Sequence, residues 1–306
     1  GGLHTLEKQH ENYLEKGPSR VSPFTIPMMI ANIASGLISM EYQLAGPNMS
    51  IVTACASANH NIGEAWRMIK FGDADAFLAG GAEASISVMG LSGFGAMKAL
   101  SSRNDEPQKA SRPFDKDRDG FVMSEGAGIV VIEELDHAKS RGADIYCEIV
   151  GYGVSADAYH MTSPHPEGHG ASKCMNLALH HAQMNPEDVD YINAHGTSTG
   201  LGDICETNAI KLSFGDHSKN GLVVSSTKSM TGHLLGAAGG IELAACIKSI
   251  NENIVAPTIN LDDPDPECDL DYVPNTSREL NVDVALSNSF GFGGHNASIV
   301  LKRFDG

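Results

Sequence analysis

The sequence predicts an α/β fold built from two similar halves. Short apolar runs typical of buried strands alternate with longer helical segments along most of the 306 residues. This alternation favours mainly parallel sheets covered by helices. A buried strand followed directly by a chemically reactive residue and then a helix occurs once in each half, which indicates an internal duplication. The composition, with 42% hydrophobic and 19% charged residues, is that of a globular protein.

The first half is expected to contain three strands. They lie at 50–54, 75–81 and 128–133, with a helix from Cys55 to about residue 71 and a short helix at 135–139. Only 49 residues precede the first strand, and their pattern predicts no further core strand. We therefore expect that an N-terminal strand–helix part of this half is missing from the chain.

The second half repeats the plan. Strands are predicted at 146–154, 189–194 and 222–227, helices at 171–184 and 236–250, and a final pair of strands at 284–287 and 297–301 around a glycine-rich turn. We place the division between the halves near residue 140. The expected domains are therefore 1–140, which carries Cys55, and 141–306, which carries His195, Lys228 and His233.

Charge and cysteine usage exclude several classes of function. The chain has 21 Lys and Arg against 38 Asp and Glu, a net charge of −17, so a nucleic-acid partner is not expected. Its six cysteines include no CxxC pair, which argues against a zinc knuckle or a redox dithiol and suits a reducing cytoplasm. No apolar run reaches the about 18 residues needed to span a bilayer, so membrane insertion is not expected.

Cys55 is a candidate nucleophile because it lies between a predicted strand and the start of a helix. The unpaired N–H groups at a helix N-terminus stabilise a thiolate, and we expect them to lower the pKa of this thiol. The small residues around it (TACASA) leave room for a substrate. A buried structural cysteine is an equally good interpretation of this motif alone.

His195 opens an HGTSTGLGD loop at the carboxyl end of a predicted strand, where open α/β sheets bind ligands. Thr197 and Thr199 add hydroxyl donors to that loop. A single histidine is more often structural, but one at a strand end in such a loop is less often so.

A third motif, SSTKSMTGHLLGAAGGIE, places Lys228 and His233 after another strand. A phosphate-binding P-loop is excluded because no GxxxxGK[ST] pattern precedes the lysine. Three helix carboxylates, Asp203, Glu206 and Glu242, either have no special role or pair with Lys228. The fourth motif, NSFGFGGHN at 288–296, is a glycine-rich turn that can direct N–H groups at an anion. Together the four motifs favour acyl-transfer chemistry.

These motifs, and SRPFDKDRDGFVMSEGAG at 111–128, resemble the β-ketoacyl-acyl-carrier-protein synthases in content and order. The resemblance spans nearly the whole chain. The set of one Cys, two His and one Lys is similar to that of the elongating branch. The initiating branch has Asn in place of the second His, and a biosynthetic thiolase has a second Cys. TACAS followed by Asn61-Ile62-Gly63 is most similar to type II enzymes.

The resemblance implies a five-layered αβαβα thiolase-like fold, a homodimer, and catalysis without a metal or organic cofactor. It implies that Cys55 takes an acyl chain from acyl carrier protein, and that His195 and His233 assist the decarboxylation of malonyl-acyl carrier protein. Lys228, oriented by Glu242, would supply positive charge. The N–H groups of Cys55 and Phe292 would form the oxyanion hole, and Phe290 and Phe292 would gate the cysteine.

His295 departs from the family pattern, in which Thr follows GFGG. Arg20, Lys98 and Arg103 are candidate contacts for the acidic carrier protein by their positions in the family, although each is as well explained as a solvated surface charge. Two alternatives share these motifs: a polyketide-type ketosynthase, and a non-catalytic partner subunit that sets chain length. The second is disfavoured because such a subunit would lack Cys55.

Overall fold

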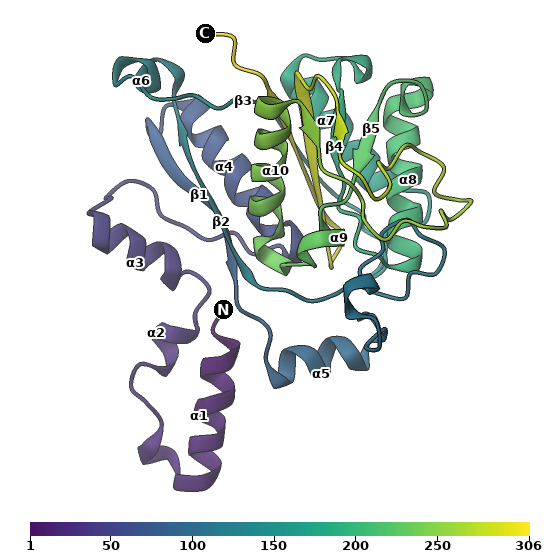
Figure 1. The fold of residues 1–306 in the computed structure, drawn as a ribbon. Coiled ribbons are helices and arrows are strands. Elements are labelled where there is room, and N and C mark those ends of the chain that lie inside the picture. Colours follow the sequence, from purple (N-terminus) through teal and green to yellow (C-terminus); the bar gives the residue numbers. More distant parts are fainter.

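Two sheets of very different size organise the structure, a computed structural model that describes residues 1–306 (Figure 1). The larger sheet has the strand order β3-β9-β8-β4-β5, formed by Glu148–Ala156, His295–Lys302, Val284–Gly291, Tyr191–Asn193 and Val223–Ser225. The smaller sheet pairs β1 (Ala76–Glu83) with β2 (Gly126–Glu133) in antiparallel register. A short ribbon pairs β6 (Ile254–Val255) with β7 (Arg278–Glu279).

One side of the large sheet, β8-β4-β5, is parallel, and this brings the ends of its strands together. Asn193, the last residue of β4, lies opposite Ser225 of β5 and Ser287 of β8. The carboxyl ends of these three strands therefore meet at the same edge, as parallel pairing requires. The residues that follow β4 and β5 are the histidine and lysine segments predicted to carry chemistry.

Helices α4 (Ser57–Phe71) and α10 (Ala238–Glu252) lie between the two sheets, and α7 (His169–Ala182) and α8 (Gly200–Phe214) cover the other face of the large sheet (Figure 1). Strand residues alternate between two cores. Ile192 and Val224 face the core with α7 and α8, whereas Tyr191 and Val223 face the core with α4 and α10. The central helices approach the small sheet closely: a Cβ on Gly240 would lie 2.2 Å from the carbonyl oxygen of Gly128.

Four of the five expected layers are therefore present: α7 and α8, the large sheet, α4 and α10, and the β1–β2 pair. The outer face of the small sheet is open, with Leu78, Ile129 and Val131 exposed by 41%, 49% and 61%. No helix of the chain covers these side chains. The alternation of strands and helices and the central pair of helices agree with the predicted α/β plan.

The remaining helices lie beside this body. They are α1 (Leu3–Lys16), α2 (Thr25–Met29), α3 (Ile33–Tyr42), α5 (Val88–Ala96), α6 (Leu135–Ser140) and α9 (Lys228–Thr231). Glu7 attaches α1 to α5, because its carboxylate accepts the hydroxyl of Ser87 at 2.6 Å and the N–H of Met89 at 2.8 Å. None of the helices combines the length and the apolar character that crossing a membrane would require.

The strand predicted at 50–54 is not formed. No strand lies beside this segment to pair with it, and side chains from the following helix bind its backbone instead. Asn61 accepts the N–H of Ile51 at 2.9 Å and donates to its carbonyl at 3.3 Å, and Ser57 accepts the N–H of Thr53 at 2.9 Å. The other predicted strands are present, with ends shifted by a few residues.

Candidate functional site

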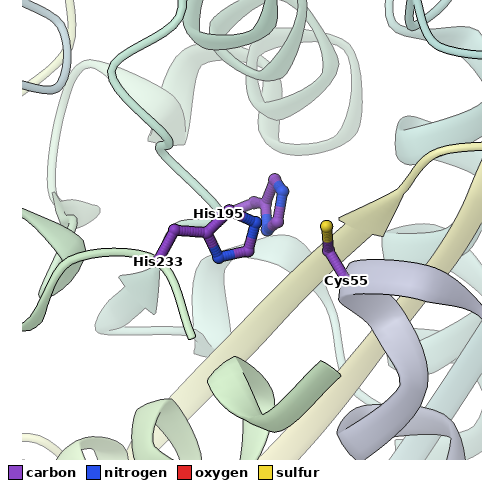
Figure 2. A group of neighbouring side chains, drawn as sticks. All are labelled: Cys55, His195 and His233. Atoms are coloured by element: carbon purple, nitrogen blue, oxygen red, sulfur yellow. The ribbon is translucent and has the colours of Figure 1, made fainter. Parts of the chain in front are cut away.

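A thiol and two imidazoles from distant parts of the chain meet in one place. One ligand atom from each of Cys55, His195 and His233 lies within 4.8 Å of the others, and Figure 2 shows the cysteine sulfur directed toward the two rings. The rings of His195 and His233 stand nearly perpendicular, with their centroids 5.3 Å apart. The structure therefore brings together three of the residues predicted from separate motifs.

Cys55 is held by a tight turn, Ala54–Ala56, that leads directly into α4. Ala54 adopts a left-handed conformation with φ 50°, a strained state that surrounding contacts must maintain. The backbone of β8 packs against this turn, since a Cβ on Gly291 would lie 2.5 Å from the carbonyl oxygen of Thr53. The turn therefore fixes the direction of the thiol.

Burial raises the pKa of Cys55 to about 11, and the charge of Lys228 and the N–H of Phe292 only partly oppose this. The expectation of a lowered pKa was therefore wrong for the free site. The side chain is 9% exposed and packs with Phe121, Met123 and Leu235, so a thiolate there loses most of its hydration. The resting group is a neutral thiol at neutral pH.

His195 lies at the end of β4, and Glu206 on α8 fixes its backbone. The carboxylate accepts the N–H of His195 at 2.8 Å and that of Gly196 at 2.7 Å. On the ring, Nδ1 lies 3.4 Å from the Nζ of Lys228. An ammonium group can only donate, so Nδ1 accepts and Nε2 carries the proton of the neutral ring. His195 is thereby prepared as a donor.

His233 is 2% exposed, and its backbone is tied to the other half of the chain. Its N–H donates to the carbonyl of Val122 at 2.7 Å, and its ring meets Phe121 edge-on at 5.3 Å. Burial and then the charge of Lys228 hold the pKa of both His195 and His233 well below the usual value. Both rings are therefore neutral at physiological pH.

The cation at the site is neutralised by one carboxylate. Lys228 forms a buried ion pair with Glu242, with side-chain exposures of 1% and 3%. Asp203 and Glu206, the other two candidate partners, make no such pair with the lysine. Burial raises the pKa of Glu206 to about 7 and that of Asp203 to about 6, and both accept backbone N–H groups.

The predicted threonines and phenylalanines line the same cavity of about 370 Å³ as the thiol and the imidazoles. The hydroxyls of Thr197 and Thr199 lie 3.0 Å apart. Near the end of β8, the ring of Phe290 lies beside that of His195, with centroids 5.8 Å apart. The ring of Phe292 lies beside that of Phe94, with centroids 6.4 Å apart. The N–H groups of Phe292 and Cys55 both act to lower the pKa of the thiol, although burial outweighs them.

Other predicted residues lie away from this cavity. Arg20, Lys98, Arg103 and His295 are not among its lining residues. His295 instead begins β9, near His60, whose pKa is lowered mainly by burial and further by the charge of His295. The cavity also includes residues that no motif singled out, chiefly Phe94, Thr162 and Ser163, and Phe121, which lies in the 111–128 motif but was given no role.

A thiol and two imidazoles are also ligands that Zn²⁺ accepts in proteins. The same three side chains therefore suit either a soft metal or covalent catalysis.

Two family models match most of the chain. The beta-ketoacyl synthase N-terminal domain matches residues 1–138, and the beta-ketoacyl synthase C-terminal domain matches residues 146–262. The chain is 57% identical over 303 residues to 3-oxoacyl-(acyl-carrier-protein) synthase 2 of Coxiella burnetii, covering 99% of this chain and 73% of that protein. It is 55% identical over 305 residues to the synthase 2 of Staphylococcus aureus (strain COL), covering 100% and 73%.

Solved structures of two ketosynthases also superpose closely on the chain. A beta-ketoacyl synthase from Burkholderia phymatum superposes with a TM-score of 0.93 at 38% identity, over 99% of this chain and 73% of the other. A type II polyketide ketosynthase, solved with its acyl-carrier protein and bound to the hexaketide, superposes with a TM-score of 0.95 at 39% identity, over 99% and 76%.

Proposed function

Because the chain belongs to the β-ketoacyl synthase family, we propose that Cys55 is the nucleophile with which it condenses acyl groups. The chain is a condensing enzyme of fatty acid synthesis and an acyltransferase. The observation that supports the assignment of residues is the meeting of Cys55, His195 and His233 within 4.8 Å in one cavity.

The first step is acyl transfer. The sulfur of Cys55 attacks the thioester of an acyl-acyl carrier protein, a new thioester forms on Cys55, and the carrier thiol leaves with the cysteine proton. Since the pKa of Cys55 is about 11, the attack requires that this proton be removed as the bond forms. The neutral imidazole of His233 can accept it, whereas His195 has no free acceptor nitrogen because Lys228 occupies its Nδ1 and Nε2 carries the proton.

The second step is the decarboxylation of malonyl-acyl carrier protein. Loss of CO₂ leaves an electron pair that is delocalised as an enolate, and the negative oxygen requires donors. His195 presents Nε2–H because Lys228 occupies its Nδ1, and His233 adds the second ring. Donors already in place in a poorly hydrated cavity stabilise such charge without reorganisation.

In the third step, the carbanion attacks the Cys55 thioester and a tetrahedral oxyanion forms. The N–H groups of Cys55 and Phe292, both close to the sulfur, would hold that oxygen. Collapse breaks the C–S bond, releases β-ketoacyl-acyl carrier protein and leaves Cys55 as a thiolate, which takes one proton from solvent to become the thiol again. Phe290 and Phe292, on the glycine-rich turn, would gate access to the cysteine.

We propose that the partners are acyl- and malonyl-loaded acyl carrier protein, with Arg20, Lys98 and Arg103 as candidate contacts, and a second copy of the chain. A homodimer is supported by the many large apolar side chains exposed on α2 and α3 and on the segment before Cys55, among them Phe24, Ile26, Met40 and Val52. Contiguous apolar surface of this kind marks association sites.

The test of the nucleophile is the intact mass of the chain after incubation with acyl-acyl carrier protein. We expect one added acyl group on the wild type and none on Cys55→Ala. His233→Ala should still form the adduct but decarboxylate malonyl-acyl carrier protein slowly. An adduct on Cys55→Ala would overturn the assignment of the nucleophile, and an equal loss of both steps in His233→Ala would overturn the role given to that ring.

A further inference from the structure

One segment of the first half holds both histidine loops of the second half. This bridging segment, residues 111–124, begins with the SRPFDKDRDG motif. Toward the threonine loop (residues 195–199), the N–H of Arg112 donates to the hydroxyl of Ser198 and the N–H of Gly120 to its carbonyl, both at 3.0 Å. Toward His233, the carbonyl of Val122 accepts the backbone N–H of His233 at 2.7 Å. The backbone N–H of Ser124 donates to the carbonyl of His233 at 3.0 Å.

Ser198 explains why the threonine loop requires such support. It is fully buried and has φ 68°, a left-handed conformation that is strained for a residue other than glycine. The bridging segment binds both of its oxygens. Its neighbours Thr197 and Thr199 both extend into the cavity, so the strained residue determines where the two hydroxyls stand.

Arg118 is the strongest link between the two segments. Its side chain is 2% exposed, and its guanidinium donates to the carbonyl of Thr199 at 3.0 Å and to that of Gly200 at 2.6 Å. It also donates to the carboxylate of Asp265 at 2.7 Å and to the carbonyl of Asp115 at 2.8 Å. The planar fork of arginine reaches these acceptors at once, which an ammonium group cannot do.

We propose that Arg118 is a positioning residue for catalysis: through the carbonyls of Thr199 and Gly200 it holds the Thr197 and Thr199 hydroxyls against the carrier-bound substrate. It touches no reacting atom, and neither the thiol nor the imidazoles depend on its charge. This inference rests on the proposed function, because it assumes that thioesters borne by a carrier protein enter this cavity.

The test compares a carrier substrate with a small reagent. In Arg118→Gln, kcat/KM for malonyl-acyl carrier protein should fall about tenfold or more, mainly through KM, since small displacements of positioning groups are costly. Alkylation of Cys55 by iodoacetamide should keep its wild-type rate. Arg118→Lys should not restore KM, whereas the control Arg141→Gln, which alters an exposed arginine paired with Glu133, should behave as the wild type.

If Arg118→Gln does not fold, Asp265→Ala replaces it as the test. This variant removes one acceptor of the guanidinium and should raise KM for malonyl-acyl carrier protein, by less than is expected for Arg118→Gln. Wild-type KM in folded Arg118→Gln, recovery of KM by Arg118→Lys, or equal loss of alkylation and condensation would each overturn the inference. Failure of the proposed function is recognised separately, because the wild type itself would then form no acyl adduct.

Discussion

Replacing Lys228 with Met removes a buried cation and leaves the Glu242 carboxylate, 3% exposed, without its partner. Breaking a buried ion pair from one side costs about 3–5 kcal/mol, against a total stability of about 5–15 kcal/mol for a typical protein. The single variant should therefore be markedly destabilised in denaturant unfolding. The double variant Lys228→Met/Glu242→Leu carries neither charge, and its stability should return close to the wild-type value.

Activity should not return with stability. In both variants His195 loses the donor 3.4 Å from its Nδ1, and with it the fixed tautomer that presents Nε2–H to the cavity. Release of CO₂ from malonyl-acyl carrier protein should fall by about 10²-fold, the usual cost of losing one preorganised donor. A stable double variant that decarboxylates at the wild-type rate would refute this role of Lys228, and a single variant as stable as the wild type would refute the cost assigned to the unpaired carboxylate.

Three further outcomes are expected. Because burial raises the pKa of Cys55 to about 11, its alkylation by iodoacetamide should accelerate about tenfold per pH unit between about pH 7 and 9, and a plateau below about pH 8 would show that Lys228 and the start of α4 outweigh burial. Burial also raises the pKa of Glu206 to about 7, so its stabilising contribution is complete below the unfolded pKa and is lost as the pH rises through 7. The free energy of unfolding of Glu206→Gln, relative to that of the wild type, should therefore rise by up to about 3 kcal/mol from acidic to neutral pH. A difference that stays constant with pH would contradict this. Sedimentation should detect a dimer that Met40→Asp weakens, and a monomer at all concentrations would count against the exposed apolar side chains of α2 and α3 as its interface.

Two residues at the centre of the site could be predicted because each follows a strand in the parallel part of the large sheet. His195 and Lys228 come directly after the apolar runs that form β4 and β5, and parallel pairing brings those strand ends together. The pairing of Lys228 with Glu242 was one of three open alternatives, and only the packing of α10 selected it. The division of the chain near residue 140 remains a proposal, since residues of both halves form one shared core.

Other features depend on contacts that no local pattern carries. The segment 50–54 has the composition of a strand, but a strand requires a neighbour, and Asn61 and Ser57 bind its backbone instead. Phe121 and Arg118 lie in an irregular segment where periodicity gives no signal, although they contact His233 and the threonine loop. The pKa of Cys55 was misjudged because the start of a helix is visible in the sequence, whereas the burial of the thiol is not.

The electrostatics of the site suit a reaction that begins and ends without charge on the protein. Cys55 is a neutral thiol and both imidazoles are neutral, and the charges of Lys228 and Glu242 beside them cancel. A net positive site would hold the malonyl carboxylate and oppose the loss of CO₂, whereas a neutral one favours it. Donors aimed into a poorly hydrated cavity then act selectively on the enolate and the tetrahedral oxyanion, the states in which negative charge develops on oxygen. The ion pair thus places the positive Nζ of Lys228 beside His195. Because the pair has no net charge, it does not stabilise the malonyl carboxylate of the ground state.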